Sequence, residues 1–264
     1  MIKPKLTLLK VGGKVVEQER SLSTLLQNFK QISTFKLLVH GGGQLATEIS
    51  KKLGIVPKMY EGRRITDADT LKVVTMVYAG LVNKNIVAKL QALQINALGL
   101  SGADLNLIQA YRRPAEPIDF GFVGNIDKVN VEILCSLIEQ QICPVMCAIT
   151  HDGQGNLLNT NADTIASALA IALSNFFEVT LVYCFEKIGV LLDVNDETTL
   201  ITELTQATYQ IYKNQGRIYG GMLPKLDNAF QALHQGVHKV IIGSENMQFN
   251  ASPANWIGTH ITLT

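Results

Sequence analysis

Apolar runs of strand length alternate with helical patterns along most of this chain, and this alternation restricts the folds open to it. The runs cover residues 6–11, 36–40, 96–100, 142–149, 179–184 and 237–242. Helical spacing of apolar residues predicts helices at 21–31, 43–53, 67–93, 130–141, 161–175, 203–214 and 222–235. The pattern predicts an α/β fold, a three-layer αβα sandwich with an open, mainly parallel central sheet. In such folds, ligands bind beyond the carboxyl ends of the strands.

Two segments depart from the alternation. Residues 103–128 carry few helical signals, which favours short antiparallel strands at an edge of the sheet. Residues 151–159 are typical of a turn that enters a short strand. Neither a repeat nor a linker-like composition marks a domain boundary.

Composition excludes several classes of function. With 47% hydrophobic residues among 264, the chain can bury a large core. Lys and Arg total 23 against 22 Asp and Glu, so the net charge of +1 gives no footprint for nucleic acid or an anionic membrane. The apolar stretch at 165–173 is far shorter than the ~20 residues of a membrane span. We expect a cytoplasmic protein whose partners are small molecules.

Four cysteines, Cys135, Cys143, Cys147 and Cys184, lie in apolar surroundings without a C-x-x-C pair. Cys143 and Cys147 could contribute to a zinc site, but no neighbouring His or Cys pair completes one. The pattern favours reduced cysteines buried in strands, and it predicts no metal held by side chains.

Two strands end in glycine turns. Gly12 and Gly13 follow the first strand, and Gly41 to Gly43 follow the second. Glycine adopts positive φ cheaply, and the first N–H groups of a helix are unpaired, so such turns are typical of anion sites. A tight connection without a ligand is the alternative. Lys10, at the end of the first apolar strand, is costly there unless it meets a partner or a charged ligand.

The starts of two predicted helices carry polar or charged residues that helix formation alone does not explain. Asn159, Asn161 and Asp163 could each cap the helix that begins near 161, but one cap is enough. Near the C-terminus, Gly220 and Gly221 open a helix with Lys225 in its first turns. A lysine there opposes the helix dipole, which indicates an anionic ligand.

Seven motifs in a fixed order resemble those of the amino acid kinase family over nearly the whole chain. They are KVGGK at 10–14, VHGGGQ at 39–44, GRRITD at 62–67, GFVGNI at 121–126, NTNAD at 159–163, GVL at 189–191 and GGMLPK at 220–225. The arginine motif joined to NTNAD is similar to the branch whose acceptor is N-acetylglutamate. The resemblance implies transfer of the ATP γ-phosphoryl group to the side-chain carboxylate of an N-acyl-L-glutamate in arginine biosynthesis.

Two other functions stay open. One is a sibling kinase of the same fold, and the other is a non-catalytic amino-acid sensor. The presence of Lys10, Lys225 and Asp163 argues against the sensor, because a binding module has no use for paired phosphoryl-neutralising lysines.

The resemblance also implies roles for individual residues. Lys10 and Lys225 would neutralise the transferring phosphoryl group, with Asp163 organising both ammonium groups. The acceptor would be bound by Gly42, Gly43, Arg64 as a clamp on the α-carboxylate, and Asn159. The nucleotide would be bound by Gly12, Gly13, Glu186, Gly189 and Tyr219. ATP would carry Mg²⁺, held mainly by its own phosphates. Residues 1–178 would form the acceptor-binding and dimerisation lobe and 179–264 the nucleotide lobe of one continuous domain.

The acceptor needs no catalytic base, because a carboxylate with a pKa near ~4.3 is already ionised at neutral pH. His40, at a strand end, is the tempting base, but a structural hydrogen bond is the favoured interpretation of that residue.

Two departures from the family pattern bear on the ligands. In FEKIGVL, Phe185 and Glu186 replace a small polar residue and an Asp, which leaves the nucleotide contacts near 183–192 open. Arg63 stands where a leucine is usual, so an acidic acyl group such as succinyl is an alternative to acetyl. Against it, neighbours in an extended segment face opposite sides, and Arg112 or Arg113 could serve only if their loop folds over the site.

The oligomer is expected from the same resemblance. Arginine-inhibited members carry an N-terminal helix that links dimers into a hexamer, and five residues precede Leu6 in this sequence. We therefore expect a homodimer that is insensitive to arginine.

Overall fold

The computed structural model describes residues 2–250 and 252–264. The chain divides into two compact units. The terminal unit contains both chain ends, Met1–Lys36 and Ala166–Thr264, and the central unit is Leu37–Ile165. Among the described residues, no helix combines the length and apolar character that crossing a membrane requires.

The first segment of the chain belongs with the last because of strand pairing. β1 (Lys5–Val11) runs parallel to β11 (Glu178–Phe185), in register from Lys5 opposite Glu178 to Val11 opposite Cys184. The compact units therefore divide the chain differently from the lobes 1–178 and 179–264, whose assignment to acceptor and nucleotide stays a prediction.

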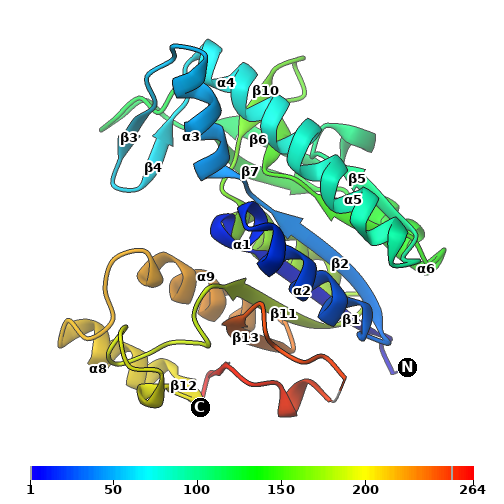
Figure 1. The fold of residues 1–264 in the computed structure, drawn as a ribbon, viewed down its shortest axis with the longest axis vertical. Coiled ribbons are helices and arrows are strands. Elements are labelled where there is room, and N and C mark those ends of the chain that lie inside the picture. Colours follow the sequence, from blue (N-terminus) through cyan, green and yellow to red (C-terminus); the bar gives the residue numbers. More distant parts are fainter. Residues whose placement is uncertain (1, 251) are drawn as a thin grey trace. The chain divides into compact units, whose positions relative to one another are not determined.

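In the terminal unit the strands lie in the order β12, β14, β13, β11, β1. β13 (Lys239–Ser244) is parallel to β11, whereas β14 (Thr259–Thr262) is antiparallel to β13 and parallel to β12 (Glu203–Thr205). The helices are α1 (Gly13–Glu17), α2 (Glu19–Lys30), α8 (Gln206–Asn214) and α9 (Met222–His234). Figure 1 shows α9 beside β13. α9 packs against both β13 and β14, and α1 contacts β11. Buried leucines and valines of β1 and β11 fill the core.

The central unit holds a parallel set in the order β2, β8, β5, namely Phe35–His40, Cys143–Met146 and Ala97–Leu100. Its helices are α3 (Gly43–Lys52), α4 (Ala68–Thr75), the π-helix η1 (Met76–Val82), α5 (Asn83–Ala92) and α6 (Val131–Glu139). α5 packs on β5 and β8, and α6 packs on β8. The chain leaves this unit within α7 (Ala162–Ser174).

A second sheet and a hairpin complete the central unit. The sheet has the order β10, β9, β6, β7, with bounds Leu157–Asn159, Ile149–His151, Ile108–Arg112 and Gly124–Val129. The hairpin pairs β3 (Lys58–Tyr60) with β4 (Arg63–Ile65). Short 3₁₀ turns are η2 (Asp104–Asn106), η3 (Glu197–Thr199) and η4 (Pro253–Asn255).

The predicted α/β class with a mainly parallel sheet is confirmed, with local corrections. The helix expected at 67–93 contains the π segment η1, whose extra residue turns Val77, Tyr78 and Val82 inward. The run at 142–149 divides between β8 and β9. The start of the segment 203–214 is a strand, because Thr205 Oγ1 accepts from the Thr208 N–H at 3.1 Å and begins α8 there.

The antiparallel strands expected within 103–128 exist as β6 and β7, which pair with each other. They do not lie at an edge of the main sheet, because β6 also pairs with β9, and these strands form a separate sheet with β10. The turn and short strand expected at 151–159 are confirmed by β10. The four cysteines are buried and reduced, but two of them do not lie in strands: Cys135 is in α6, and Cys147 lies between β8 and β9. The short helix α1, the hairpin β3–β4 and the strand β14 had not been predicted.

His40 connects three elements of the central unit at the carboxyl end of β2. Its side chain is fully buried, and Nδ1 donates to the Gly41 carbonyl at 2.8 Å. Nε2 accepts from Asn83 Nδ2 at 3.0 Å, and the same amide donates to the Val145 carbonyl at 2.9 Å. Burial lowers the pKa of His40 from 6.5 to about 4. His40 is therefore a neutral structural residue with both ring nitrogens in use.

This network predicts how stability depends on pH. The pKa of His40 is about 4 in the folded chain and near 6.5 in the unfolded chain, so between these values the unfolded chain binds more protons. The free energy of unfolding should fall by about 2 kcal/mol from this residue alone between pH 7 and pH 5. Urea unfolding of the wild type and of His40→Gln at both pH values measures the difference, which the variant should lose. NMR titration of the wild type gives an independent reading, and an imidazole that protonates near pH 6.5 would contradict the prediction.

Candidate active site

Backbone hydrogen bonds bring three of the sequence motifs together in the central unit. The N–H of Thr66 donates to the Phe120 carbonyl at 2.9 Å, and the N–H of Phe122 donates to the Thr66 carbonyl at 2.7 Å. On the other side, the N–H of Asn159 donates to the Phe122 carbonyl at 2.9 Å. Segment 120–122 therefore joins GRRITD to NTNAD, although 93 positions separate Thr66 from Asn159.

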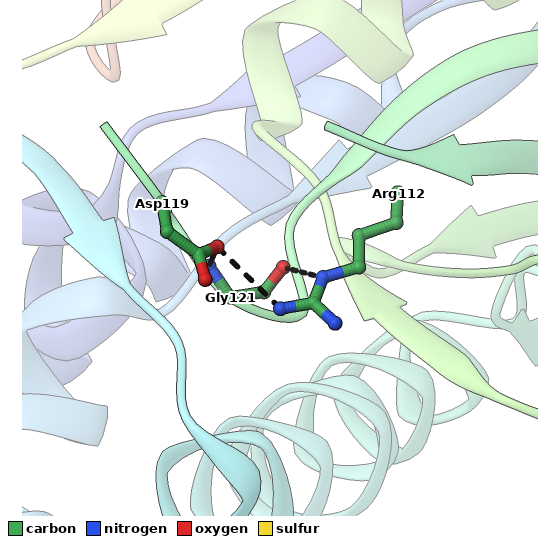
Figure 2. Close-up of polar contacts among 3 residues, drawn as sticks. All are labelled: Arg112, Asp119 and Gly121. Atoms are coloured by element: carbon green, nitrogen blue, oxygen red, sulfur yellow. Dashed lines mark hydrogen bonds and ion pairs between the residues drawn. The ribbon is translucent and has the colours of Figure 1, made fainter. Parts of the chain in front are cut away.

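Arg112 and Asp119 hold that segment in shape. Figure 2 shows Arg112 Nε donating to the Gly121 carbonyl at 2.8 Å, with Nη2 at 3.4 Å from Asp119 Oδ1. The same carboxylate oxygen accepts from the Gly121 N–H at 2.7 Å. Gly121 has φ +71°, and a Cβ there would overlap the Thr66 carbonyl. Glycine is thus required where segment 120–122 passes Thr66.

Arg64 is anchored beside the glycine turn. Its side chain is 8% exposed, and Nη2 donates at 2.7 Å to both the Gly43 carbonyl and Thr47 Oγ1. Nη1 is also buried, yet it has no hydrogen-bond partner among the described residues. A buried cationic donor left over is costly unless a ligand accepts from it. The guanidinium is therefore held in place with one nitrogen ready for an anion.

The glycine turn itself is shaped by the π-helix. Gly42 has φ +147°, and a Cβ there would come within 3.1 Å of the Tyr78 ring and 3.3 Å of Val82. It precedes α3, whose N-terminus has no side-chain cap. The N-terminus of α3, whose helix dipole favours negative charge, therefore lies next to Arg64. Tyr78 and Thr47 are site residues that the sequence motifs did not indicate, and only the structure reveals them.

The polar residues of the NTNAD motif have different functions, as the surplus of capping groups indicated. Asn161 caps α7, since its Oδ1 accepts from the N–H groups of Asp163 and Thr164 at 2.8 and 3.1 Å. Asn159 Nδ2 donates to Thr66 Oγ1 at 3.0 Å, which points the amide at the junction of the three motifs. Asp163 lies in the first turn of α7, and its pairing with lysines stays a prediction.

In the terminal unit, Lys10 is 7% exposed and lies opposite Tyr183 within the sheet. It is a buried strand residue and not a lysine that reaches the surface from an edge. Gly12 follows, donating its N–H to the Cys184 carbonyl at 2.7 Å. A Cβ at Gly12 would lie 3.2 Å from that carbonyl oxygen and 3.3 Å from Phe185 Cβ. The first glycine turn therefore runs close along the end of β11.

Glu186, directly after β11, interacts with two lysines. Its Oε1 lies 2.8 Å from Lys14 Nζ. Partial burial alone would raise the pKa of Glu186, but the Lys14 hydrogen bond and the charges of Lys14 and Lys225 bring it below its usual value. The hydrogen bond that Lys14 donates to Glu186, together with the negative charge of Glu186, raises the pKa of Lys14. Lys225, in the first turns of α9, is thus near this pair.

Two predicted nucleotide residues have different surroundings. A Cβ at Gly189 would come within 2.5 Å of Leu200 and 2.7 Å of Thr259 Oγ1, so packing alone accounts for that glycine. Tyr219 is 65% exposed and lies just before α9, where its ring is open to a ligand. Gly13 begins α1. Nucleotide contacts at these positions stay predictions.

No group of three or more His, Cys, Asp or Glu side chains within 2–250 and 252–264 is arranged to bind a metal ion.

Comparison with known proteins agrees with these motifs. The model of the amino acid kinase family matches residues 5–244. The acetylglutamate kinase of Bacteroides thetaiotaomicron is 58% identical over 241 residues, covering 91% of this chain and 94% of that protein. The protein of the same name from Parabacteroides distasonis is 59% identical over 238 residues, covering 90% and 93%.

Solved structures share the fold at low identity. Carbamate kinase from Giardia lamblia has a TM-score of 0.73 at 15% identity, with 100% of both chains covered. N-acetylglutamate synthase from Neisseria gonorrhoeae has a TM-score of 0.83 at 20% identity, covering 100% of this chain and 60% of that one. Because the family model spans most of the sequence and the relatives match across nine-tenths of it, this chain belongs to the amino acid kinase family.

Proposed function

We propose that this chain transfers the γ-phosphoryl group of ATP to the side-chain carboxylate of an N-acyl-L-glutamate, forming an acyl phosphate for arginine biosynthesis. The observation that carries the proposal is Arg64, fixed beside the N-terminus of α3 with a buried Nη1 that has no partner among the described residues. The similarity to proteins named acetylglutamate kinase supports the same acceptor.

Acceptor binding is assigned to the central unit. Arg64 Nη1 is the donor available to the α-carboxylate, while Nη2 keeps the guanidinium in place through Gly43 and Thr47. Gly42 lets the substrate approach the backbone, because the turn carries no side chain at that point. Asn159, fixed through Thr66, supplies an amide that can hydrogen-bond the acyl-amino group.

Nucleotide binding is assigned to the terminal unit. This assignment includes Lys10, Gly12 and Gly13, which lie outside the nucleotide lobe 179–264 expected from the sequence, because β1 pairs with β11. Lys225 and Lys10 would carry the positive charge that a crowded phosphoryl-transfer transition state requires. Glu186, in the place of the usual aspartate, would orient Lys14 and Lys225 through its ionised carboxylate.

The chemistry of phosphoryl transfer to a carboxylate determines whether a base, a metal ion and further charged residues are needed. The acceptor carboxylate is ionised at neutral pH and attacks without a base, and His40 is excluded as one because both of its nitrogens are in use. Mg²⁺ would be held mainly by the ATP phosphates and water. Asp163 would organise the two lysines from the first turn of α7. We also propose that the reaction takes place in the cytoplasm.

A sibling kinase is the second candidate, and it differs in the acceptor. A panel of aspartate, glutamate, carbamate and N-acyl-glutamates separates the two by the acceptor that is phosphorylated. Carbamate has no α-carboxylate for Arg64 to bind, and free aspartate and glutamate carry an ammonium group where an N-acyl-glutamate carries a neutral amide. A non-catalytic sensor would bind an amino acid without consuming ATP.

Lys225→Ala should lower kcat by about a hundredfold or more and change the acceptor KM much less, because the charge matters most in the transition state. Steady-state kinetics at saturating ATP measures both constants. Lys30→Ala, which removes an exposed lysine of α2, is the control and should match the wild type. A Lys225→Ala enzyme within a few fold of wild-type kcat would contradict the role.

Arg64→Ala should raise the acceptor KM by roughly tenfold to a hundredfold, since a charged hydrogen bond to the α-carboxylate is made in ground and transition states alike. Arg64→Lys keeps the charge but loses the Nη2 anchor to Gly43, so it should restore only part of the affinity. Thermal melts check that both variants fold. An effect confined to kcat would count against the clamp.

We further propose a homodimer that arginine does not inhibit. Met76 and Leu81 of η1 are 55% and 46% exposed, which gives the central unit an apolar helical face for a second copy. Light scattering should give about twice the chain mass of 28.9 kDa. Met76→Lys with Leu81→Lys should shift the protein toward the monomer. A hexamer, or inhibition by millimolar arginine, would overturn this proposal.

A further inference from the structure

Two arginines beside the acceptor residues lack a carboxylate partner. Arg63 is exposed on β4, directly before Arg64. Arg113 follows β6 and donates from Nε to Asn125 Oδ1 at 3.0 Å. Among the described residues, neither Arg63 nor Arg113 forms an ion pair.

One aromatic ring connects the two arginines. The Arg113 guanidinium lies over the face of Phe120, 5.2 Å from the ring centre. The edge of the same ring contacts Tyr60, with ring centres 6.3 Å apart, and Tyr60 is the cross-strand partner of Arg63. Burial and the charge of Arg63 both lower the pKa of Arg113. The two cations are therefore close enough to repel each other.

Arg112 differs from both. Its guanidinium is used within the loop, on the Gly121 carbonyl and the Asp119 carboxylate, as Figure 2 shows. Three arginines at 63, 112 and 113 thus have separate roles, and of these three only Arg112 pairs with a carboxylate among the described residues. Arg63 and Arg113 carry like charges and Arg113 is partly buried, so an anion bound between them would be stabilised by both.

The pair adjoins the groups assigned to the acceptor. The Arg113 N–H donates to the Val123 carbonyl at 2.8 Å, and Val123 is bridged to Asn159. Arg63 shares β4 with Arg64 but faces the other side, so the two guanidiniums cannot hold one carboxylate. They can hold two different carboxylates of one acceptor, the α-carboxylate at Arg64 and a second one on its acyl group.

We propose that Arg63 and Arg113 form a cationic subsite for a carboxylate at the far end of the acyl group, so that the preferred acceptor is an N-acyl-L-glutamate with a dicarboxylic acyl group, of which succinyl is the simplest. The inference rests on the proposed function. An acetyl group has no charge to place there, whereas a succinyl carboxylate would relieve the repulsion and accept charge-assisted hydrogen bonds from both arginines.

The test compares kcat/KM for N-acetyl-, N-succinyl- and the uncharged N-succinamoyl-L-glutamate. The wild type should favour the succinyl compound by about tenfold or more over either of the others. Arg63→Leu and Arg113→Met should each lower kcat/KM for the succinyl compound about tenfold, and change it for the acetyl compound by no more than about threefold. Arg63 is exposed, so Arg63→Leu should fold even if Arg113→Met does not. Lys58→Met removes a cation from the same hairpin and should leave the ratio unchanged.

Each contrary outcome has a distinct meaning. A wild type that prefers the acetyl compound, with a ratio that neither arginine variant changes, would overturn the subsite and leave the kinase intact. Absence of turnover with every acceptor would instead refute the proposed function. Free succinate is the remaining control: if it alters turnover of the acetyl compound and Arg63→Leu abolishes that effect, the pair binds a separate effector and the acyl assignment is wrong.

Discussion

The candidate acceptor site depends on three peptide hydrogen bonds that join Thr66, segment 120–122 and Asn159. Backbone groups in a buried region must be paired, so these bonds fix where each neighbouring side chain starts. Arg64 is held two residues before Thr66, and Asn159 donates back to the Thr66 hydroxyl. Because Gly121 leaves no room for a Cβ next to the Thr66 carbonyl, the junction tolerates one residue type at its centre.

The arginines around this junction differ in the groups that their guanidiniums contact. Arg64 has hydrogen bonds on one nitrogen and none on the other, Arg112 is neutralised within its loop, and Arg113 lies on an aromatic face near Arg63. A neutral His40 sits at the end of β2, where a cation would be costly. Within the described part of the chain, Arg63, Arg64 and Arg113 have no carboxylate partner, so positive charge is concentrated where an anionic acceptor would bind.

The alternation of apolar runs with helical spacing predicted the class of fold because burial on both faces of a parallel strand leaves a plain signal. The pairing of β6 with β9 was missed, since both strands are short and they come from segments that are distant in sequence. The π-helix at Met76–Val82 changes the spacing of apolar residues too little to be recognised in the sequence, yet it places the Tyr78 ring against Gly42. The motifs pointed to Arg64 and Asn159 as acceptor-binding residues, but they did not predict the hydrogen bonds through Thr66 and segment 120–122 that connect them. Nor could the sequence distinguish Arg112 from Arg113, because their difference lies in Asp119 and in the fold of one loop.

The most direct test of the account is acceptor-dependent formation of an acyl phosphate. Purified chain is incubated with ATP and Mg²⁺, with and without N-acetyl- or N-succinyl-L-glutamate, while ADP is followed and the product is trapped with hydroxylamine. The account predicts ADP only with an acylated glutamate and an equal amount of hydroxamate. ADP release that is independent of the acceptor, or binding of the acceptor without any turnover, would contradict it.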